Sequence, residues 1–209
     1  MKFSLVIPCY NESKNLPALI KSCEKLIKSY DIEVVIVDNG SNDDTREKFK
    51  TLVKGKSKIK LLRVDVNKGY GNGILAGLRF SKGDIIGWTH ADMQTNPLDF
   101  IEGIKKFEKF GEDIFVKGRR HNRPFSDNFF TIGMSIFESL LLRQFMWDIN
   151  AQPTIFSRKF FNTWNHPPMD FSLDLYAYYM AKKRRIRIHR FPVNFFTFEI
   201  SKADAFMDF

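Results

Sequence analysis

The chain has few cysteines and no long apolar run, and both absences narrow its class. Only two cysteines, Cys9 and Cys23, occur among 209 residues; that is too few for a disulfide framework and typical of a reducing compartment. No window reaches about 18 consecutive apolar residues, the length that a membrane-spanning helix needs. The apolar stretch after Met1 is too short for a signal peptide. We therefore expect a cytoplasmic protein without a transmembrane span.

Three common motifs of nucleotide binding and hydrolysis are also missing. There is no Gly-x-x-x-x-Gly-Lys-Ser/Thr sequence, which excludes a P-loop. The glycines do not follow the first predicted strand, as they would in a dinucleotide-binding fingerprint. No Gly-x-Ser-x-Gly elbow is present, which excludes the nucleophile of an α/β-hydrolase. Any nucleotide must therefore be bound by another arrangement of residues.

The composition is that of a globular domain with a basic second half. Hydrophobic residues make up 44% and charged residues 27% of the chain, a balance typical of soluble globular proteins. The formal net charge is +9, and residues 1–114 carry 19 Lys and Arg against 16 Asp and Glu. Residues 115–209 carry 14 Lys and Arg against 8 Asp and Glu. A basic surface can serve nucleic acid, anionic lipid or a phosphorylated substrate.

Short apolar runs alternate with segments of helical periodicity over the first 116 residues. The predicted strands are 3–7, 33–37, 59–64, 84–89 and 114–116. The predicted helices are 13–29, 43–53, 71–80 and a fourth that Asn96 caps and that continues through Phe107. This alternation predicts an α/β fold with a mostly parallel central sheet and helices on both faces. We expect a single domain over residues 1–209, with one half at 1–118 and the other at 119–209.

The pattern changes after residue 120. Residues 126–147 form a long, mostly apolar segment of helical periodicity, longer than a small sheet normally covers. The segment fits either a core helix or a helix partly immersed in a membrane interface. A strand at 154–156, a helix at 171–183 and a strand at 186–198 complete the expected elements.

The most informative motif follows the predicted strand at 84–89. Because side chains alternate along an extended chain, His90, Asp92 and Gln94 are expected to point the same way. An Asp between a His and an amide, at the edge of an open sheet, can hold one hard cation beside a diphosphate. The alternative for this segment is an ordinary strand end with a solvated Asp92.

Polar or glycine-rich segments also follow the first three predicted strands, where ligands of open α/β sheets bind. They are Pro8-Cys9-Tyr10-Asn11-Glu12, Asp38-Asn39-Gly40-Ser41 and Asn67-Lys68-Gly69-Tyr70-Gly71-Asn72-Gly73. The first segment can stack on a base and hydrogen-bond it or the ribose, and the Asp38 carboxylate can accept an N–H of the base. Glycines in the third allow backbone N–H groups to face an anionic ligand. Each segment taken alone also fits a simple turn.

Together these motifs resemble, in order, those of the dolichol-phosphate mannosyltransferase-like branch of the family 2 glycosyltransferases. Residues 90–94 resemble the family's Asp-Ala-Asp-Leu-Gln, and residues 6–12 resemble its Val-Ile-Pro-Thr-Tyr-Asn-Glu opening. Residues 38–41 and 67–73 are similar to its Asp-Asp-Gly-Ser and Asn-x-Gly-x-Gly-x-Ala segments. The resemblance covers about residues 3 to 198. It implies a GT-A fold, a nucleotide-sugar donor, a divalent cation and inversion at the anomeric carbon.

The resemblance also implies which residues bind the donor and the cation. The donor-binding residues would be Pro8, Tyr10, Asn11, Glu12, Asp38, Asn39, Gly40, Ser41, Asn67, Lys68, Gly69, Gly71, Ala91 and Asp92. The metal ligands would be His90, Asp92 and Gln94, with Mn²⁺ or Mg²⁺ as the ion. Since His90 replaces the first Asp of the family motif, we expect manganese to be preferred over magnesium. His90 could equally hydrogen-bond a diphosphate oxygen.

The second half carries the expected acceptor side. Lys117-Gly118-Arg119-Arg120 resembles the family's Gly-Ser-Arg, in which the Arg binds acceptor phosphate, although a solvated basic loop is the alternative. Asp148 opens a segment similar to the family's acceptor region and is expected to orient the acceptor or act as a base. Arg158 closes that segment and is expected to contact the donor diphosphate. Asp174 matches an acidic position in the family's late helix, where helix capping is the simpler explanation.

These residues favour an inverting hexosyltransferase, with Asp92, Asp148, Arg120 and Arg158 as its catalytic residues. The expected acceptor is a polyprenyl phosphate, which the protein would reach peripherally at the cytoplasmic face of an anionic membrane. One alternative is transfer to a glycan hydroxyl, which needs Asp148 as a base. Another is an inactive nucleotide-sugar-binding module, which the change to His90 keeps open. Nucleic-acid binding has only the charge in its favour and is not expected.

Overall fold

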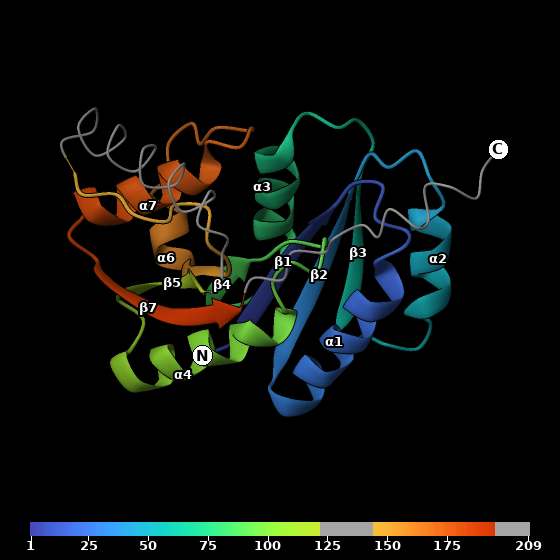
Figure 1. The fold of residues 1–209 in the computed structure, drawn as a ribbon, viewed down its shortest axis with the longest axis horizontal. Helices are drawn as coiled ribbons and strands as arrows, with labels where there is room; N and C mark the ends of the chain where they lie inside the picture. The colour runs from blue at the N-terminus through green and yellow to red at the C-terminus, as the bar shows by residue number, and fades with distance from the viewer. Residues whose placement is uncertain (122–143, 195–209) are drawn as a thin grey trace.

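The computed structural model describes residues 1–121 and 144–194, and within them the chain forms a seven-stranded sheet with helices on both sides (Figure 1). The strands are β1 (Phe3–Cys9), β2 (Ile32–Asn39), β3 (Ile59–Val64), β4 (Ile85–Trp88), β5 (Ile114–His121), β6 (Thr154–Ser157) and β7 (Arg187–Asn194). The helices are α1 (Leu16–Ser29), α2 (Thr45–Leu52), α3 (Tyr70–Phe80), α4 (Phe100–Phe110), α6 (Arg158–Phe161) and α7 (Leu173–Lys183), with a 3₁₀ turn η1 (Pro97–Asp99) before α4. The predicted α/β fold with helices on both faces is confirmed.

The strand order is β3-β2-β1-β4-β6-β5-β7, and one strand runs against the others. Strand β1 pairs in parallel with β2 and β4, β2 with β3, and β5 with β7. Strand β6 is antiparallel to both β4 and β5. The carboxyl ends of the six parallel strands therefore lie along one edge of the sheet, whereas β6 ends at the opposite edge. This edge is called the carboxyl edge below, and the opposite one the amino edge.

Two apolar layers, one on each face of the sheet, follow from the alternation of strand side chains. Leu5 and Ile7 belong to the layer that includes α1, α2 and α4, whereas Val6 belongs to the layer that includes α3, α6 and α7. Figure 1 shows the same division, with α3, α6 and α7 above the sheet, α1 and α4 below it, and α2 to the right, next to α1. Strands buried on both faces explain the uninterrupted apolar runs in the sequence.

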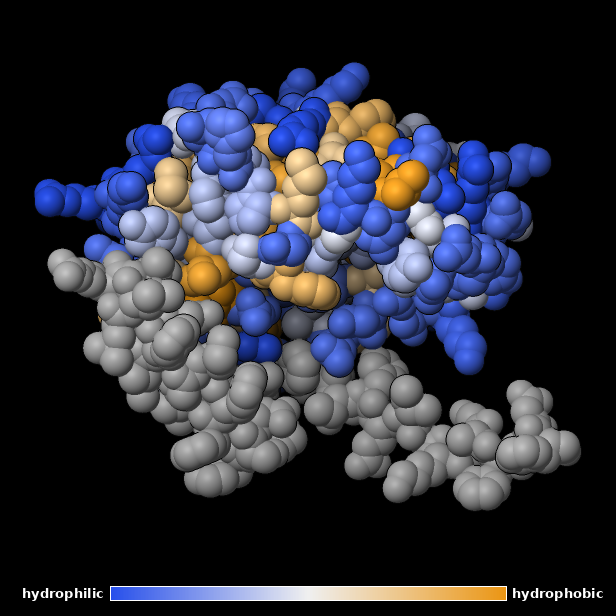
Figure 2. All heavy atoms as spheres, turned by 90° about the horizontal axis from the view of Figure 1, so that it is seen from above, coloured by the Kyte–Doolittle hydropathy of each residue, from blue (hydrophilic) through white to orange (hydrophobic). Residues whose placement is uncertain are grey.

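Helix α3 approaches the sheet closely because a glycine faces the strands. A Cβ added at Gly77 would lie 2.3 Å from Cγ1 of Val6 and 2.8 Å from Cγ2 of Val37. Larger side chains there would push α3 away from β1 and β2. Seen from the side that carries α3 and α7, the surface is mostly hydrophilic, with hydrophobic residues in a broken band across it (Figure 2).

The predicted elements agree with the structure best in the first half. Strand β5 is longer than the predicted 114–116, since it continues to His121. Of the predicted helix at 126–147, residues 126–143 lie outside the described part, and residues 144–147 are not helical, so the prediction is wrong at its end. The alternatives of a core or an interfacial helix concern mostly residues outside the described part. The same holds for residues 195–198 of the predicted last strand.

The halves predicted at 1–118 and 119–209 share one sheet. Strands β6 and β7 come from the second half and pair with β4 and β5. In the described residues, none of the helices combines the length and the apolar composition that crossing a bilayer requires.

Candidate functional site

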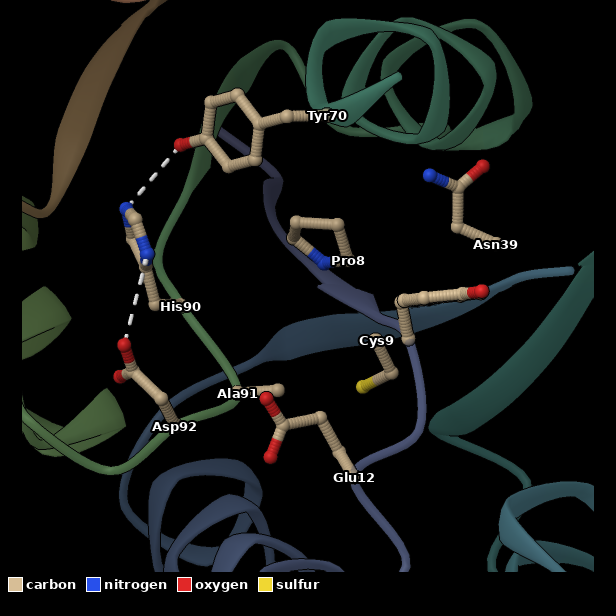
Figure 3. Close-up of a pocket in the computed structure, with 9 residues that line it drawn as sticks. Pro8, Cys9, Glu12, Asn39, Tyr70, His90, Ala91 and Asp92 are labelled. Atoms are coloured by element: carbon tan, nitrogen blue, oxygen red, sulfur yellow. Dashed lines mark hydrogen bonds and ion pairs between the residues drawn. The ribbon is translucent and has the colours of Figure 1, made fainter. Parts of the chain in front are cut away.

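The candidate site lies at the carboxyl edge, where the chain order changes direction across the sheet. Strands β2 and β3 follow β1 on one side, and β4 lies on its other side. The crevice at such a switch point is where open α/β sheets bind ligands. A cavity of about 150 Å³ occupies it, called the first pocket here (Figure 3). It is lined by Pro8, Cys9, Tyr10, Glu12, Asn39, Tyr70, His90, Ala91 and Asp92.

A second pocket of about 240 Å³ adjoins the first. Its wall consists of His90, Asp92, Gln94, Thr95, Arg120, Asn150 and Gln152. His90 and Asp92 thus belong to both cavities and form the partition between them. The predicted metal motif therefore borders both a cavity lined by residues of β1, β2 and α3 and one to which the second half of the chain contributes Arg120, Asn150 and Gln152.

The loop after β4 gives the motif its geometry. Strand β4 ends at Trp88, so strand alternation does not orient the three motif side chains as expected. Instead, the hydroxyls of Thr89 and Thr95 lie 3.1 Å apart and close the loop. The backbone N–H of Gln94 donates to Oδ1 of Asp92 at 3.0 Å. His90, Asp92 and Gln94 nevertheless face one cavity, the second pocket.

His90 and Asp92 offer one nitrogen and one carboxylate to a cation. Nδ1 of His90 lies 3.9 Å from Oδ2 of Asp92, and both side chains are one-third exposed. Two metal–ligand bonds of about 2.1 Å each span up to ~4.2 Å, so one ion could contact both atoms. In the part of the chain that the structure describes, no group of three or more His, Cys, Asp or Glu side chains is placed to hold a metal ion. The residues present therefore fit an ion whose remaining ligands come from a bound diphosphate and water.

Tyr70 lies behind His90 and connects it to α7. Its hydroxyl is 3.1 Å from Nε2 of His90 and donates to Oδ2 of Asp174 at 3.1 Å. Figure 3 shows this hydroxyl directed at the imidazole, which in turn faces Asp92. The Tyr70 ring stacks on Phe171, with centroids 5.0 Å apart. Burial, together with the charge of Asp174, raises the pKa of Tyr70 well above its usual value, so the phenol keeps its proton.

A buried lysine lies next to the Asp174 carboxylate and balances its negative charge. Lys117 is fully buried, and its Nζ donates to Oγ1 of Thr154 at 2.7 Å and lies 3.6 Å from Oδ1 of Asp174. Burial lowers the pKa of Lys117 to about 8, against the opposing effect of Asp174. Nε2 of Gln152 also donates to Oδ1 of Asp174, at 2.7 Å. These donors surround the carboxylate on the side that faces away from Tyr70.

The loops after β1 and β2 are hydrogen-bonded to each other, so not all of their residues line the first pocket. The N–H of Asn11 donates to Oγ of Ser41 at 3.1 Å, and Oδ1 of Asn11 accepts from the N–H of Asn42 at 2.9 Å. Asn11 itself has a left-handed backbone, with φ of 56°. Glu12 does line the pocket, and burial, with a contribution from Asp92, raises its pKa. Asn11 and Ser41 therefore bond each other and are not part of the pocket lining.

Asp38 and Asn39 are placed differently although they are adjacent. Asp38 is fully buried, forms an ion pair with Arg63 and accepts the N–H of Ser41 at 2.9 Å. Asn39 lines the first pocket and donates from Nδ2 to the carbonyl of Gly69 at 3.0 Å. Within the described residues, its buried Oδ1 has no hydrogen-bond partner. Asn39 thus presents an unused acceptor beside the pocket, whereas base recognition by Asp38 stays a prediction.

The glycines around the start of α3 leave room for another segment of the chain rather than for a ligand. Gly69 has a φ of +110°, and a Cβ at Gly71 would lie 2.8 Å from the carbonyl oxygens of Pro168 and Asp170. The N–H of Asn72 donates to the carbonyl of Met169 at 2.9 Å. The expectation that these backbone N–H groups face an anionic ligand is therefore wrong at Asn72, because residues 168–170 cover this end of α3.

Three further residues predicted to bind the donor lie in the loops after β2 and β3 but do not line the first pocket. Gly40 has a φ of +79°, and a Cβ there would lie 2.8 Å from the backbone nitrogen of Asn67. Asn67 accepts from Asn39 and from the N–H of Gly69. Lys68 is exposed on the loop after β3. A direct role of these residues in donor binding stays a prediction.

Arg120 and Asp148, both predicted on the acceptor side, form one unit. Asp148 is buried and accepts the Arg120 N–H at 2.9 Å, its Nε at 2.7 Å and its guanidinium at 2.5 Å. Arg190 donates to the carbonyls of Trp147 and Asp148, at 2.7 and 3.0 Å. Arg120 lines the second pocket. Both oxygens of Asp148 are therefore used to hold Arg120 in the pocket wall.

The prediction that Arg158 contacts the donor diphosphate is wrong. Arg158 follows β6, whose last residue pairs with Ile85 at the start of β4, so it lies at the amino edge. Its guanidinium donates to the carbonyls of Gly83, Leu78 and Ser81 at 2.7, 3.1 and 2.7 Å. The antiparallel direction of β6 carries it away from both pockets.

Several residues of the two pockets were not predicted as site residues. They are Cys9, Tyr70, Thr95, Asn150 and Gln152, with Lys117 behind them; Asp174, next to Lys117, is matched only to an acidic position in the family's late helix. Tyr70 stands inside the glycine-rich motif, and its aromatic ring between two glycines was an available signal. Lys117 and Asp174 are 57 residues apart in sequence, and no local pattern predicts their pairing.

The chain is similar to proteins of a known family. The family model described as "Glycosyl transferase family 2" matches residues 4–163. A dolichol-phosphate mannosyltransferase from Pyrococcus furiosus is 34% identical over 131 residues, which are 60% of this chain and 37% of that protein. A dolichyl-phosphate beta-glucosyltransferase from Dictyostelium discoideum is 27% identical, over 97% of this chain and 69% of that protein. The chain thus spans little more than a third of the archaeal relative.

A solved structure supports the fold. Glucosyl-3-phosphoglycerate synthase from Mycobacterium tuberculosis, in complex with Mn²⁺, UDP-glucose and phosphoglyceric acid, superposes with a TM-score of 0.72. The likeness covers 93% of this chain and 70% of that one at 18% identity. The predicted GT-A fold is confirmed by this likeness.

Proposed function

Because the chain belongs to glycosyl transferase family 2, we propose that it transfers a hexose from a nucleoside diphosphate sugar to a polyprenyl phosphate, with inversion at the anomeric carbon. The names of the Pyrococcus and Dictyostelium relatives, a dolichol-phosphate mannosyltransferase and a dolichyl-phosphate beta-glucosyltransferase, support this substrate class. The arrangement of two pockets that share His90 and Asp92 supports a two-substrate reaction at their partition.

The first pocket is the proposed donor site. Tyr10 is 44% exposed at its rim, where its ring could cover a base. The unpartnered Oδ1 of Asn39 could accept a hydrogen bond from the base or the ribose. The similar Mycobacterium structure binds UDP-glucose with Mn²⁺, which supports a nucleotide sugar and a divalent cation here.

His90 and Asp92 would hold the cation, with Gln94 close by on the second-pocket side. When bound, the ion would neutralise charge on the leaving diphosphate. The chain's own contribution is to fix these side chains: the Gln94 N–H holds Asp92, and Tyr70 holds His90. A preorganised pair of this kind loses little entropy when the donor arrives.

The pairing of Asp148 with Arg120 is the observation that carries the choice of acceptor. A phosphate oxygen is largely ionised near about pH 7, so it needs no strong general base to attack the anomeric carbon. A sugar hydroxyl does need one, and Asp148 is the candidate. Because Arg120 occupies both oxygens of Asp148, the geometry favours an acceptor phosphate next to Arg120 over a glycan hydroxyl.

Peripheral contact with an anionic membrane is part of the proposal, since a polyprenyl chain resides in the bilayer. Phe145 and Phe171 are 71% and 77% exposed, and Trp147 is 37% exposed. Lys182 lies 5.9 Å from the Phe145 ring centre. Aromatic rings beside basic side chains are suited to the headgroup region of anionic lipid.

An acceptor-swap assay tests the proposed function. UDP-glucose and GDP-mannose are each supplied with Mn²⁺ and one of three acceptors: a short-chain polyprenyl phosphate, the corresponding polyprenol, or an oligosaccharide. We expect transfer to the phosphate alone, and none from the Asp92→Asn variant. Transfer to the oligosaccharide instead would refute the lipid-phosphate acceptor and favour a hydroxyl acceptor. No binding of either nucleotide by calorimetry would refute the donor site.

A further inference from the structure

The hydroxyl of Tyr70 has one proton and two hydrogen-bonding neighbours. It lies 3.1 Å from Nε2 of His90 and 3.1 Å from Oδ2 of Asp174. Whichever neighbour receives that proton, the other must donate to the tyrosine oxygen or leave it unused. The direction of this chain of hydrogen bonds therefore decides which nitrogen of His90 carries hydrogen.

The surroundings of Asp174 fix the direction. Asp174 is 3% exposed, and Lys117, fully buried, places its ammonium 3.6 Å from Oδ1. Gln152 donates to the same oxygen at 2.7 Å. A buried ammonium requires a countercharge, so Asp174 is a carboxylate, which can only accept. Tyr70 consequently donates to Asp174, and its oxygen accepts from His90.

Nε2 of His90 is then the protonated nitrogen, and Nδ1 carries the lone pair. Nδ1 faces Oδ2 of Asp92 at 3.9 Å, on the wall between the two pockets. That distance is too long for a good hydrogen bond but within reach of a shared cation. Metal-binding histidines commonly donate their second N–H to an oxygen that orients the ring and fixes the tautomer.

We propose that Tyr70 and Asp174 are positioning residues that hold His90 in the Nε2–H tautomer, so that Nδ1 is available with Asp92 to the cation of the donor site. The role of the cation rests on the proposed function. These hydrogen bonds prepare His90 to offer a nitrogen ligand at the position where the related motif has an Asp. The change from Asp to His therefore does not imply a loss of cation binding. It also connects the donor pocket to Lys117 on β5 and Asp174 on α7, both next to the acceptor side.

The tautomer can be measured in the metal-free, full-length protein. Long-range ¹H–¹⁵N correlation spectra of ¹⁵N-histidine-labelled protein at pH 7.5 distinguish protonated from unprotonated ring nitrogens, and His90→Gln identifies the His90 signals. We expect Nε2–H in the wild type. Tyr70→Phe removes the acceptor but keeps the ring on Phe171, so a mixture of tautomers is expected. Asp174→Asn lets the amide donate to Tyr70, which reverses the chain and should give Nδ1–H.

Manganese affinity supplies a second readout. Free Mn²⁺, measured by electron paramagnetic resonance during titration with saturating UDP or GDP, should show about tenfold weaker binding in Tyr70→Phe. Tyr176→Phe is the matched control, because the Tyr176 hydroxyl bonds to the backbone of Asn165, and it should match the wild type in both measurements.

An Nδ1–H tautomer in the wild type, or unchanged tautomer and Mn²⁺ affinity in Tyr70→Phe, would overturn the positioning role. If Asp174→Asn does not fold, Tyr70→Phe alone decides. Failure of the wild type to bind UDP or GDP would overturn the proposed function instead, while an Nε2–H signal lost in Tyr70→Phe would still support the positioning role.

Discussion

The carboxyl and amino edges of the sheet each hold an arginine predicted for the site, and the two have opposite roles. Arg120, at the carboxyl edge, is held by the Asp148 carboxylate in the wall of the second pocket. Arg158, at the amino edge, donates to the carbonyls of residues 78–83, where α3 ends and β4 begins. Arg120 is thus held in place beside a cavity, whereas Arg158 connects backbone segments through hydrogen bonds. Variants at each edge should therefore change different quantities.

The largest effect is expected at the carboxyl edge, from Asp92→Asn. The amide keeps the shape of the side chain but loses the charge that would hold a cation, so kcat/KM should fall by at least ~1,000-fold. The melting temperature should change little, because Asp92 is one-third exposed. Asp65→Asn, at a side chain that is 95% exposed, is the control. Wild-type activity in Asp92→Asn would remove the motif from the mechanism.

Arg120→Ala should separate the acceptor from the donor. Loss of a charge-assisted contact to a phosphate costs a few kcal/mol, so acceptor kcat/KM should fall about a hundredfold while donor affinity stays unchanged. Arg119→Ala is the control, since Arg119 is the exposed neighbour on the same strand. Steady-state kinetics with varied acceptor at saturating donor gives the answer. Equal losses for donor and acceptor would place Arg120 outside the acceptor site.

Arg158→Met should lower stability and leave kcat unchanged. Four hydrogen bonds from the guanidinium are lost, and the free energy of unfolding should fall by about 2 kcal/mol. For a chain of this size that corresponds to a decrease of roughly 4–8 °C in Tm. Arg79→Met, on the exposed face of α3, should stay within ~0.5 kcal/mol of the wild type. A selective loss of donor binding in Arg158→Met would contradict the assignment to the amino edge.

The smallest effect is expected from His90→Asp. If His90 is a ligand, the ratio of manganese-supported to magnesium-supported activity should shift toward magnesium by about tenfold, since oxygen ligands suit harder ions better than imidazole does. Activity titrations with each ion measure that ratio. Identical metal profiles in the two proteins would leave His90 as a diphosphate contact or a structural residue.

Most of the fold could be predicted because the signals are local. Apolar runs buried on both faces marked β1, β2 and β4, and the helix faces followed from spacing, as in Leu16, Leu19 and Cys23 of α1. The direction of β6 could not be predicted, since a four-residue strand has no local feature that sets it. That one direction decides whether Arg158 reaches the site or the opposite edge.

The candidate site, like the fold, could be predicted only in part. Motif residues next to strand ends, such as Pro8, Glu12 and Asp92, line one cavity as expected, although their part in donor binding stays a prediction. The contacts that cross the chain were not predictable: Tyr70 meets Asp174 across 104 residues. Glycines 69 and 71 were attributed to ligand approach, but residues 168–170 use that space. Such packing depends on the tertiary structure and not on a motif.

His90 and Asp92 line both pockets, so the two cavities adjoin each other at these two side chains. A single molecule that joins a nucleoside diphosphate to a phosphate-bearing tail would need only a short tether to occupy both. Its second arm would then bind at a high effective concentration, so its affinity should exceed that of either arm by orders of magnitude. The placement of these two side chains is a template for bisubstrate inhibitors of the proposed transfer reaction.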